Sequence, residues 1–185
     1  MQWERNANQW LGALSSADPT PGGGAAAAVT GAMGCRLLLM SLRTTLKRKA
    51  TPVQHRPILE KQITQAEALL TQLKELAAQD ARAYEGYLSA TKLPKENSAR
   101  PQAVQEALWQ AALVPAQTAQ VCKQGLALVE TAQPLIDKII LSDVACARHL
   151  LRSAADCCAE NIRVNAAYIT QADRAEQLQQ LLRDL

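Results

Sequence analysis

A seam of apolar residues with helical spacing constrains the fold of this chain more than any other feature of its sequence. From residue 59 onward, the apolar positions alternate steps of four and three residues over about four heptads. This spacing predicts one long helix that packs a single face against partner helices. The positions of the seam are Leu59, Ile63, Ala66, Leu70, Leu73, Ala77, Asp80, Tyr84 and Tyr87.

The composition agrees with helices that pack at close range. Of the 185 residues, 48% are hydrophobic, most of them Ala and Leu, only 3% are aromatic, and Phe is absent. A second run of apolar and small residues with the same spacing lies between Val104 and Val129. We therefore expect an all-α fold, an up-and-down bundle of long helices, in a single domain that covers residues 1–185.

Asp80 places a carboxylate at an apolar position of the seam. A carboxylate in such a position is costly unless it is paired, hydrogen-bonded or protonated through a raised pKa. Asp80 is therefore a candidate site residue. The structural alternative is that Asp80 binds an arginine or a helix end.

A glycine-rich loop precedes a second helical segment. Residues 18–24 (Asp-Pro-Thr-Pro-Gly-Gly-Gly) run directly into the Ala-rich residues 25–35. Prolines and glycines cannot continue a helix, whereas an alanine run is a strong helix former. The loop therefore leads to a helix N-terminus, where free N–H groups and the helix dipole favour an anionic or polar ligand group.

Two familiar glycine motifs do not fit this loop. No Gly-Lys-Ser/Thr follows the glycines, which argues against a phosphate-binding P-loop, and residues 10–16 look like a short helix rather than the strand that a dinucleotide fingerprint needs. The structural alternative is that the small residues only permit tight packing.

A further helix is expected to begin at Ser142, a helix-capping residue, with Asp143 in its first turn. At 100° per residue, Asp143, Asn161 and Asn165 fall on the same buried stripe. The two asparagines could hold a polar ring system by paired donors and acceptors, or they could form helix-to-helix hydrogen bonds. His149 falls on the opposite side and is expected at the surface.

The charge pattern favours a small acidic ligand over a nucleic acid. The formal net charge is only +3, with one dense basic run at residues 47–49 and a looser group that includes Lys95. Nucleic-acid binding usually shows a basic face interleaved with aromatic residues, and this chain has no such face in its sequence. We expect no nucleic-acid partner.

The cysteines and the N-terminus indicate a reduced, cytoplasmic protein. Five cysteines form no Cys-x-x-Cys pair and the chain has two histidines, so neither a disulfide framework nor a metal site is expected. The first residues do not have the form of a signal peptide. Residues 25–42 are interrupted by Thr30 and Arg36, and we expect no membrane span there.

Taken together and in order, several segments resemble the cyclodeaminase/cyclohydrolase family of folate one-carbon enzymes. This family includes the C-terminal domain of formiminotransferase-cyclodeaminase and the methenyltetrahydrofolate cyclohydrolases. The matching segments are Pro-Thr-Pro-Gly-Gly-Gly (19–24) with its Ala-rich helix, Asp-Ala-Arg-Ala-Tyr (80–84), Leu-Pro-Lys (93–95), Ala-Leu-Val-Pro (112–115), Ser-Asp-Val (142–144) and Asn-Ile-Arg-Val-Asn (161–165). They extend over nearly all of the chain.

The resemblance implies an all-helical homodimer with a folate site near the subunit interface. It also implies chemistry at the one-carbon unit that bridges N5 and N10 of tetrahydrofolate, with no cofactor beyond this substrate. In the cyclohydrolase direction, water opens 5,10-methenyltetrahydrofolate to 10-formyltetrahydrofolate. In the cyclodeaminase direction, N10 attacks the carbon of 5-formiminotetrahydrofolate and ammonia leaves.

Within this chemistry, the two carboxylates on buried seams, Asp80 and Asp143, are the candidate catalytic residues, because each direction needs a proton donor and a group that stabilises a cation. The other residues are candidates for substrate binding. The loop would contact the pterin or the one-carbon oxygen, the asparagines would orient the pterin, and the basic residues would meet the glutamate tail. These residues are Pro21, Gly22, Gly23, Gly24, Asn161, Asn165, Lys47, Arg48, Lys49 and Lys95.

The chain departs from the family pattern at three places. Leu46 and Ala50 replace a glycine and a tyrosine that often flank the basic run, and Ile136-Asp137 replaces a Gly-Asn pair. Because Ile136 cannot easily adopt glycine backbone angles, that loop is expected to run differently. These losses leave open a folate-binding or structural member of the fold that has lost turnover. A helical scaffold unrelated to folate would require the ordered motifs to be accidental.

Overall fold

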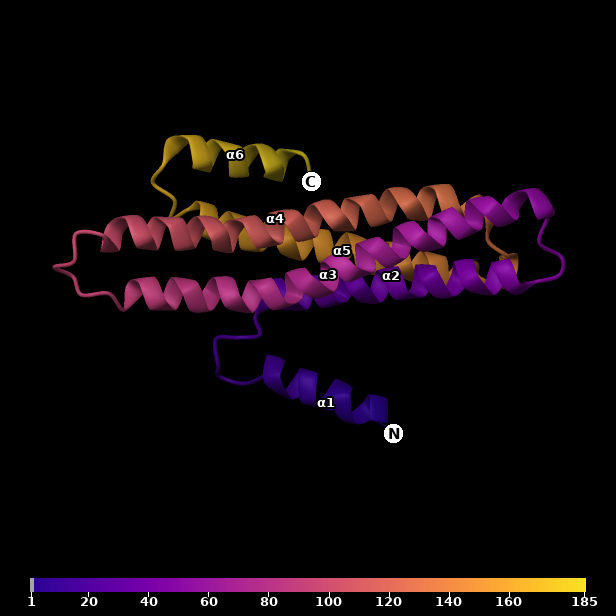
Figure 1. The fold of residues 1–185 in the computed structure, drawn as a ribbon, viewed down its shortest axis with the longest axis horizontal. Coiled ribbons are helices and arrows are strands. Elements are labelled where there is room, and N and C mark those ends of the chain that lie inside the picture. The colour runs from indigo at the N-terminus through magenta and orange to yellow at the C-terminus, as the bar shows by residue number, and fades with distance from the viewer. Residues whose placement is uncertain (1) are drawn as a thin grey trace.

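The computed structural model describes residues 2–185, apart from the side chain of Trp3, and consists of helices and their connections (Figure 1). No strand occurs in these residues, which confirms the predicted all-α class. Three short 3-10 turns, at Val53–His55, Gln133–Leu135 and Lys138–Ile140, lie in the connections. The helices are α1 (Gln2–Leu14), α2 (Gly23–Lys47), α3 (Arg56–Thr91), α4 (Arg100–Ala132), α5 (Leu141–Ala166) and α6 (Ala172–Arg183).

Helices α2 to α5 form an up-and-down bundle. Each packs against the next helix in the chain, and α5 packs against α2 to close the ring. Small residues on α2 allow this close approach. An added Cβ on Gly34 would lie 2.9 Å from Cγ of Leu151 on α5, so a larger residue there would force the two helices apart.

The predicted seam of α3 is buried over its first half. Leu59 and Leu73 are 0% exposed, and they pack in the main core cluster with Leu38 and Leu42 of α2. The prediction is wrong for Tyr84, which is 38% exposed. The reason is geometric, because α3 continues past the point where α2 begins and loses this neighbour there.

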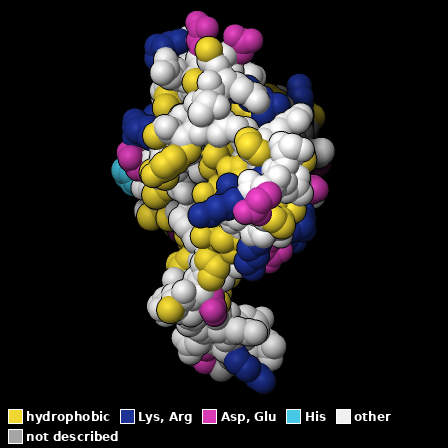
Figure 2. Space-filling model, turned by 90° about the vertical axis from the view of Figure 1, so that its left-hand side faces the viewer, with side chains coloured by type: hydrophobic (Ala, Val, Ile, Leu, Met, Phe, Trp, Pro, Cys, Tyr) yellow, Lys and Arg dark blue, Asp and Glu magenta, His cyan; other side chains and the backbone are white. Residues whose placement is uncertain are grey.

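The two terminal helices lie outside the ring. Helix α6 covers α4 and α5 with Leu178, which is 0% exposed. Helix α1 stands apart from the bundle on the other side (Figures 1 and 2). Its residues Leu11 and Leu14 are 58% and 36% exposed, so the apolar side of α1 is not covered within one chain.

Helix α2 is long and apolar enough to span a membrane by length and composition, but 56% of its apolar window is buried inside the bundle. Its inner side includes Leu38 and Leu42, both 0% exposed. This burial is typical of a core helix.

Candidate functional site

The carboxylate of Asp80 lies at the N-terminal end of α2. Asp80 is half-buried on α3, and its Oδ2 accepts a hydrogen bond of 2.8 Å from the backbone N–H of Ala25. Ala25 is the third residue of α2, so this N–H is one of the groups that a helix cannot satisfy internally. Asp80 thus binds a helix end, as the structural alternative from the sequence requires.

Gly24 permits this approach of the carboxylate. A Cβ built on Gly24 would lie 2.0 Å from Oδ1 of Asp80, far inside van der Waals contact. The glycine loop therefore serves close contact between the backbone and a polar group, which is one of the uses that the sequence indicated.

Burial raises the pKa of the Asp80 carboxyl above its ordinary value, and the hydrogen bond from Ala25 acts in the opposite direction. The carboxyl therefore holds a proton more readily than a solvated aspartate. A group of this kind can both accept and deliver a proton, which a fully ionised surface carboxylate does less well.

Asn161 of α5 lies beside the first glycine of α2. Its Nδ2 would be 3.4 Å from a Cβ on Gly23, and the same Nδ2 donates a hydrogen bond of 2.9 Å to the carbonyl of Cys157. Gly22 caps α2 with an extended backbone and no side-chain bond. Asp80, the glycines and Asn161 therefore converge from three separate segments.

Asn165 has a structural contact. Its Nδ2 donates a hydrogen bond of 3.1 Å to the carbonyl of Ala111 on α4. This is the helix-to-helix bond that the sequence left open as the alternative to substrate binding.

Cys158 is a neighbour of Asp80 that was not among the predicted site residues. Its side chain is 0% exposed, and burial raises the pKa of its thiol, with smaller contributions from nearby groups that include Asp80. The proximity to Asp80 could not be read from the spacing on one helix, because it depends on how α3 and α5 are placed across the bundle.

The structure places Asp143 at the other end of the bundle. Asp143 lies in the first turn of α5, half-buried and with Val144 as its buried neighbour. Eighteen residues of helix separate it from Asn161, which is about 27 Å at 1.5 Å per residue. Within one chain, Asp143 therefore does not share a site with Asp80.

The basic run lies at that far end as well. Lys47 ends α2, and Lys49 follows in the loop, both exposed. Arg48 is engaged differently, since its Nε forms an ion pair of 2.6 Å with Oδ2 of Asp137. Lys95 is exposed in the loop between α3 and α4, at the end that holds Asp80.

The loop at Ile136 and Asp137 is held in place by hydrogen bonds that involve side chains. The N–H of Asp137 donates to Oγ1 of Thr45 at 3.2 Å, and its Oδ1 accepts from the N–H of Ile139 at 3.0 Å. Ile136 is 6% exposed and has an extended backbone. This loop needs no glycine angles, and Asp137 uses both the backbone and Arg48 to hold its shape.

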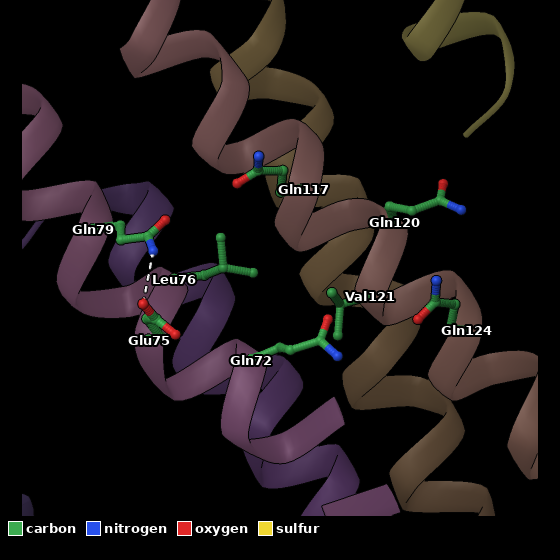
Figure 3. Close-up of a pocket in the computed structure, with 8 residues that line it drawn as sticks. All are labelled: Gln72, Glu75, Leu76, Gln79, Gln117, Gln120, Val121 and Gln124. Atoms are coloured by element: carbon green, nitrogen blue, oxygen red, sulfur yellow. Dashed lines mark hydrogen bonds between the residues drawn. The ribbon is translucent and has the colours of Figure 1, made fainter. Parts of the chain in front are cut away.

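A separate groove of 310 Å³ lies between α3 and α4 (Figure 3). Its walls are carboxamides, Gln72 and Gln79 from α3 facing Gln117 and Gln124 from α4, and Glu75 accepts a hydrogen bond from Gln79 at 3.2 Å. Carboxamides bind by hydrogen bonds but do not exchange protons near neutral pH. The groove contains none of the predicted site residues and lacks the acid–base groups of the Asp80 end.

No three His, Cys, Asp or Glu side chains among the described residues gather closely enough to hold a metal ion. At the Asp80 end, the structure brings together one carboxyl of raised pKa, the helix N-terminus of α2 and the amide of Asn161.

Several known proteins are similar to this chain in sequence and in fold. The chain is 33% identical over 172 residues to a methenyltetrahydrofolate cyclohydrolase from Methylorubrum extorquens, a match that covers 91% of this chain and 82% of that protein. It is 36% identical over 127 residues to the formimidoyltransferase-cyclodeaminase of Sus scrofa, covering 66% of this chain and 21% of the pig protein.

A crystal structure of formiminotetrahydrofolate cyclodeaminase from Thermotoga maritima superposes with a TM-score of 0.86 at 26% identity and covers 100% of this chain and 87% of that one. The family model described as formiminotransferase-cyclodeaminase matches residues 6–184. The match includes the glycine loop, Asp80 and both asparagines. The chain belongs to the formiminotransferase-cyclodeaminase family.

Proposed function

We propose that this chain is an enzyme that hydrolyses 5,10-methenyltetrahydrofolate to 10-formyltetrahydrofolate. The name and the 91% coverage of the Methylorubrum relative support this direction. The observation that carries the proposal is the half-buried Asp80 carboxyl of raised pKa, held against the N-terminus of α2. This arrangement provides acid–base catalysis next to a positive helix end.

The hydrolysis requires a proton acceptor and then a proton donor. Water adds to the methenyl carbon and loses a proton, which Asp80 accepts. The bond from this carbon to N5 then breaks, N5 takes up the proton that Asp80 holds, and the hydroxyl of the adduct loses its proton to solvent as it becomes the carbonyl of the N10-formyl group. The net reaction consumes one water and releases one proton to solvent, because the methenyl substrate is a cation. Before water adds, the ionised Asp80 also stabilises this cation.

The remaining candidate residues would bind the substrate. The N–H groups of Gly23 and Gly24 at the helix end would favour the developing oxygen, with Pro21 and Gly22 shaping the loop. The amide of Asn161 would orient the pterin. Asn165, one turn further along α5, would assist in binding the pterin while its hydrogen bond to the Ala111 carbonyl holds α5 against α4. We assign Lys95 to the glutamate tail of folate. Lys47, Lys49 and Asp143 lie at the other end of the bundle, so we assign Lys47 and Lys49 to the glutamate tail and Asp143 to a second catalytic carboxylate only at a site shared with the other copy of a homodimer.

The deaminating direction is a second candidate, supported by the TM-score of 0.86 with the Thermotoga cyclodeaminase. There, N10 of 5-formiminotetrahydrofolate attacks the formimino carbon and ammonia leaves, so that the same carboxyl would protonate the departing nitrogen. A member of the fold that binds folate without turnover is the third possibility.

We also propose that the protein acts as a homodimer in the cytoplasm, with no cofactor beyond the folate substrate. The uncovered apolar side of α1 supports an assembly larger than one chain. Three free cysteines, Cys35, Cys122 and Cys158, are buried in the bundle, which fits a reducing compartment.

Two parallel assays test the function. Purified protein is mixed with 5,10-methenyltetrahydrofolate while its near-ultraviolet absorbance is followed, and separately with 5-formiminotetrahydrofolate. Loss of absorbance in the first assay above the spontaneous rate supports the cyclohydrolase, and a gain in the second supports the cyclodeaminase. Folate binding by calorimetry with neither change identifies the inactive member.

Variants test the residues. Asp80→Asn and Asp143→Asn should each lower turnover by about 10² or more. His149→Ala is the matched control on α5, because His149 is exposed and lies on the opposite side of the helix from Asp143. Near-normal turnover in both aspartate variants would remove the catalytic assignment.

A further inference from the structure

Two tyrosines continue the stripe of Asp80 along α3. Tyr84 and Tyr87 lie four and seven residues after Asp80, so at 100° per residue the three side chains leave the helix within an arc of about 60°. At 1.5 Å per residue, the two tyrosines lie about 6 and 10 Å beyond Asp80 along the helix axis. Neither was among the predicted site residues.

The register of α2 against α3 decides what lies beside these tyrosines. Gly31 lies against Leu73, and Gly24 lies against Asp80. The two helices are therefore antiparallel, with seven residues of one matched to seven residues of the other. Because α2 begins at Gly23, the part of α3 after Asp80 extends past the N-terminus of α2. The two tyrosines thus lie beside the space in front of this helix end.

The two tyrosine rings form one aromatic surface. Their centroids are 6.3 Å apart and their planes meet at 51°, a tilted arrangement that aromatic pairs favour. Tyr87 is half-buried and packs against the core cluster that includes Leu108 and Ile162, which holds its ring in place. Tyr84 is 38% exposed. The exposed ring is therefore supported by a ring that the core holds, and a flat apolar group can cover it.

The side chains along α3 follow the same order as the groups of the folate substrate. In tetrahydrofolate, N10 is bonded directly to the p-aminobenzoyl ring, and the opposite end of this ring carries the glutamate. Along α3, Asp80 acts at the bridging carbon in the proposed mechanism, and Tyr84 follows about one helical turn later. Lys92 and Lys95 are exposed beyond the tyrosines, where the glutamate carboxylates would lie.

We propose that Tyr84 and Tyr87 form an aromatic wall against which the p-aminobenzoyl ring of the folate substrate stacks. This subsite rests on the proposed function and extends it to a part of the substrate that does not react. Figure 2 faces this end of the molecule and shows hydrophobic side chains with Lys and Arg side chains beside them. Such a surface suits a ligand that has an apolar ring next to carboxylates.

The tyrosine content of the chain allows a direct test. The chain has three tyrosines and no phenylalanine, so protein labelled with carbon-13 in its tyrosine rings gives three ring spin systems by NMR. Single replacements by phenylalanine assign them. The probe is 5-formyltetrahydrofolate, a stable folate with the complete aminobenzoylglutamate tail. On binding, the signals of Tyr84 and Tyr87 should shift and show nuclear Overhauser contacts to the aminobenzoyl protons. Tyr168, which is 65% exposed between α5 and α6, is the internal control and should not change.

Variants measure what the wall contributes to binding. Tyr84→Ala should raise the Kd of 5-formyltetrahydrofolate in calorimetry by about tenfold. Because the aminobenzoyl ring takes no part in bond making, KM for the methenyl substrate should rise by a similar factor and kcat should change much less. Tyr84→Phe keeps the ring and should restore the affinity. Tyr168→Ala is the matched control and should bind the folate as the wild type does. Tyr84 is substituted rather than Tyr87, because Tyr87 packs in the core.

Three results would overturn the wall. The first is contacts from the tyrosine rings to pterin protons in place of aminobenzoyl protons. The second is an unchanged Kd in Tyr84→Ala when circular dichroism shows the wild-type helix content. The third is a change of oligomeric state in Tyr84→Ala by light scattering with unchanged folate affinity, which would mean that another protein chain covers this ring.

Failure of the proposed function gives a different result. If the wild type binds 5-formyltetrahydrofolate but turns over neither substrate, the NMR and calorimetric tests still decide whether the wall exists. If the wild type does not bind this folate at all, the proposed function and the wall are both wrong.

Discussion

Asp80 on α3 accepts a hydrogen bond of 2.8 Å from the backbone N–H of Ala25, in the first turn of α2. Two effects compete at this contact. The free N–H and the helix dipole favour the ionised carboxylate, while burial favours the neutral acid. The pKa of Asp80 is raised, so burial dominates. A carboxyl that caps a helix therefore binds a proton more tightly than a solvated aspartate.

Gly24→Ala should damage both the fold and the site. The new Cβ would lie 2.0 Å from Oδ1 of Asp80 and would push the carboxyl away from Ala25. We expect a loss of about 1–3 kcal/mol, which is a Tm decrease of several degrees, and a fall in turnover. Gly23→Ala is the control, since its Cβ would be 3.4 Å from the Asn161 amide. Equal Tm values for the two variants in thermal unfolding would contradict this account.

Substitutions at Asp80 should separate capping from catalysis. Asn keeps an oxygen that can accept from Ala25, so Asp80→Asn should retain stability while it loses proton transfer, with turnover lower by about 10² or more. Asp80→Ala also removes the acceptor and should cost about 1 kcal/mol of stability. The measurements are urea unfolding and methenyltetrahydrofolate turnover. If Asp80→Asn lost as much stability as Asp80→Ala, the carboxamide would not replace the cap.

The raised pKa of Asp80 has a defined effect on stability. The folded state binds this proton more tightly than the unfolded chain does. Protonation of Asp80 therefore makes its full contribution to the free energy of unfolding below the unfolded-state pKa of about 3.9. This contribution declines as the pH rises through the folded-state pKa. The free energy of unfolding of the wild type relative to Asp80→Asn should therefore decrease from pH 4 toward neutrality. A relative stability that increased over this range would indicate a lowered pKa instead.

Much of this architecture is readable from local pattern. The seam from Leu59 to Leu73 repeats at helical spacing and is buried, and His149 is exposed on the predicted side of α5. Asp143 lies in the first turn of α5 as predicted, but the capping role predicted for Ser142 is wrong, because α5 begins at Leu141 and its N-cap is Ile140. Such features follow from backbone periodicity within one segment, so a single sequence contains them.

The site was predictable only in part, because its geometry depends on how distant segments meet. Sequence pattern identified Asp80 and the glycines separately, but their contact follows from the register of α3 against α2. The pattern also grouped Asp143 with Asn161 on one stripe of α5. Two residues on one stripe face the same direction, but they can lie far apart along the helix axis. At 18 residues apart they lie at opposite ends of the bundle.

The five thiols should divide into two classes. Cys146 and Cys157 are exposed, whereas the other three are buried. Burial raises the pKa of Cys35 to about 11 and that of Cys122 to about 12, so little thiolate forms there at pH 8. A disulfide reagent should label two thiols in the native protein and five after denaturation. Rapid labelling of a third native thiol would mean that the bundle opens readily.

The two asparagines of α5 should behave differently although they lie one turn apart. The amide of Asn165 joins α5 to the Ala111 carbonyl of α4, so Asn165→Ala leaves that acceptor without this donor and should lower stability by about 1 kcal/mol. Among the described residues, the amide of Asn161 donates its hydrogen bond within its own helix, to the carbonyl of Cys157, and it lies over Gly23. Asn161→Ala should therefore leave Tm nearly unchanged and raise KM for the folate substrate. Thermal unfolding and steady-state kinetics on both variants check this division. If Asn161→Ala lowered Tm and left KM unchanged, Asn161 would be a packing residue, and pterin binding at this end of the bundle would have to rest on the glycine loop and Asp80 alone.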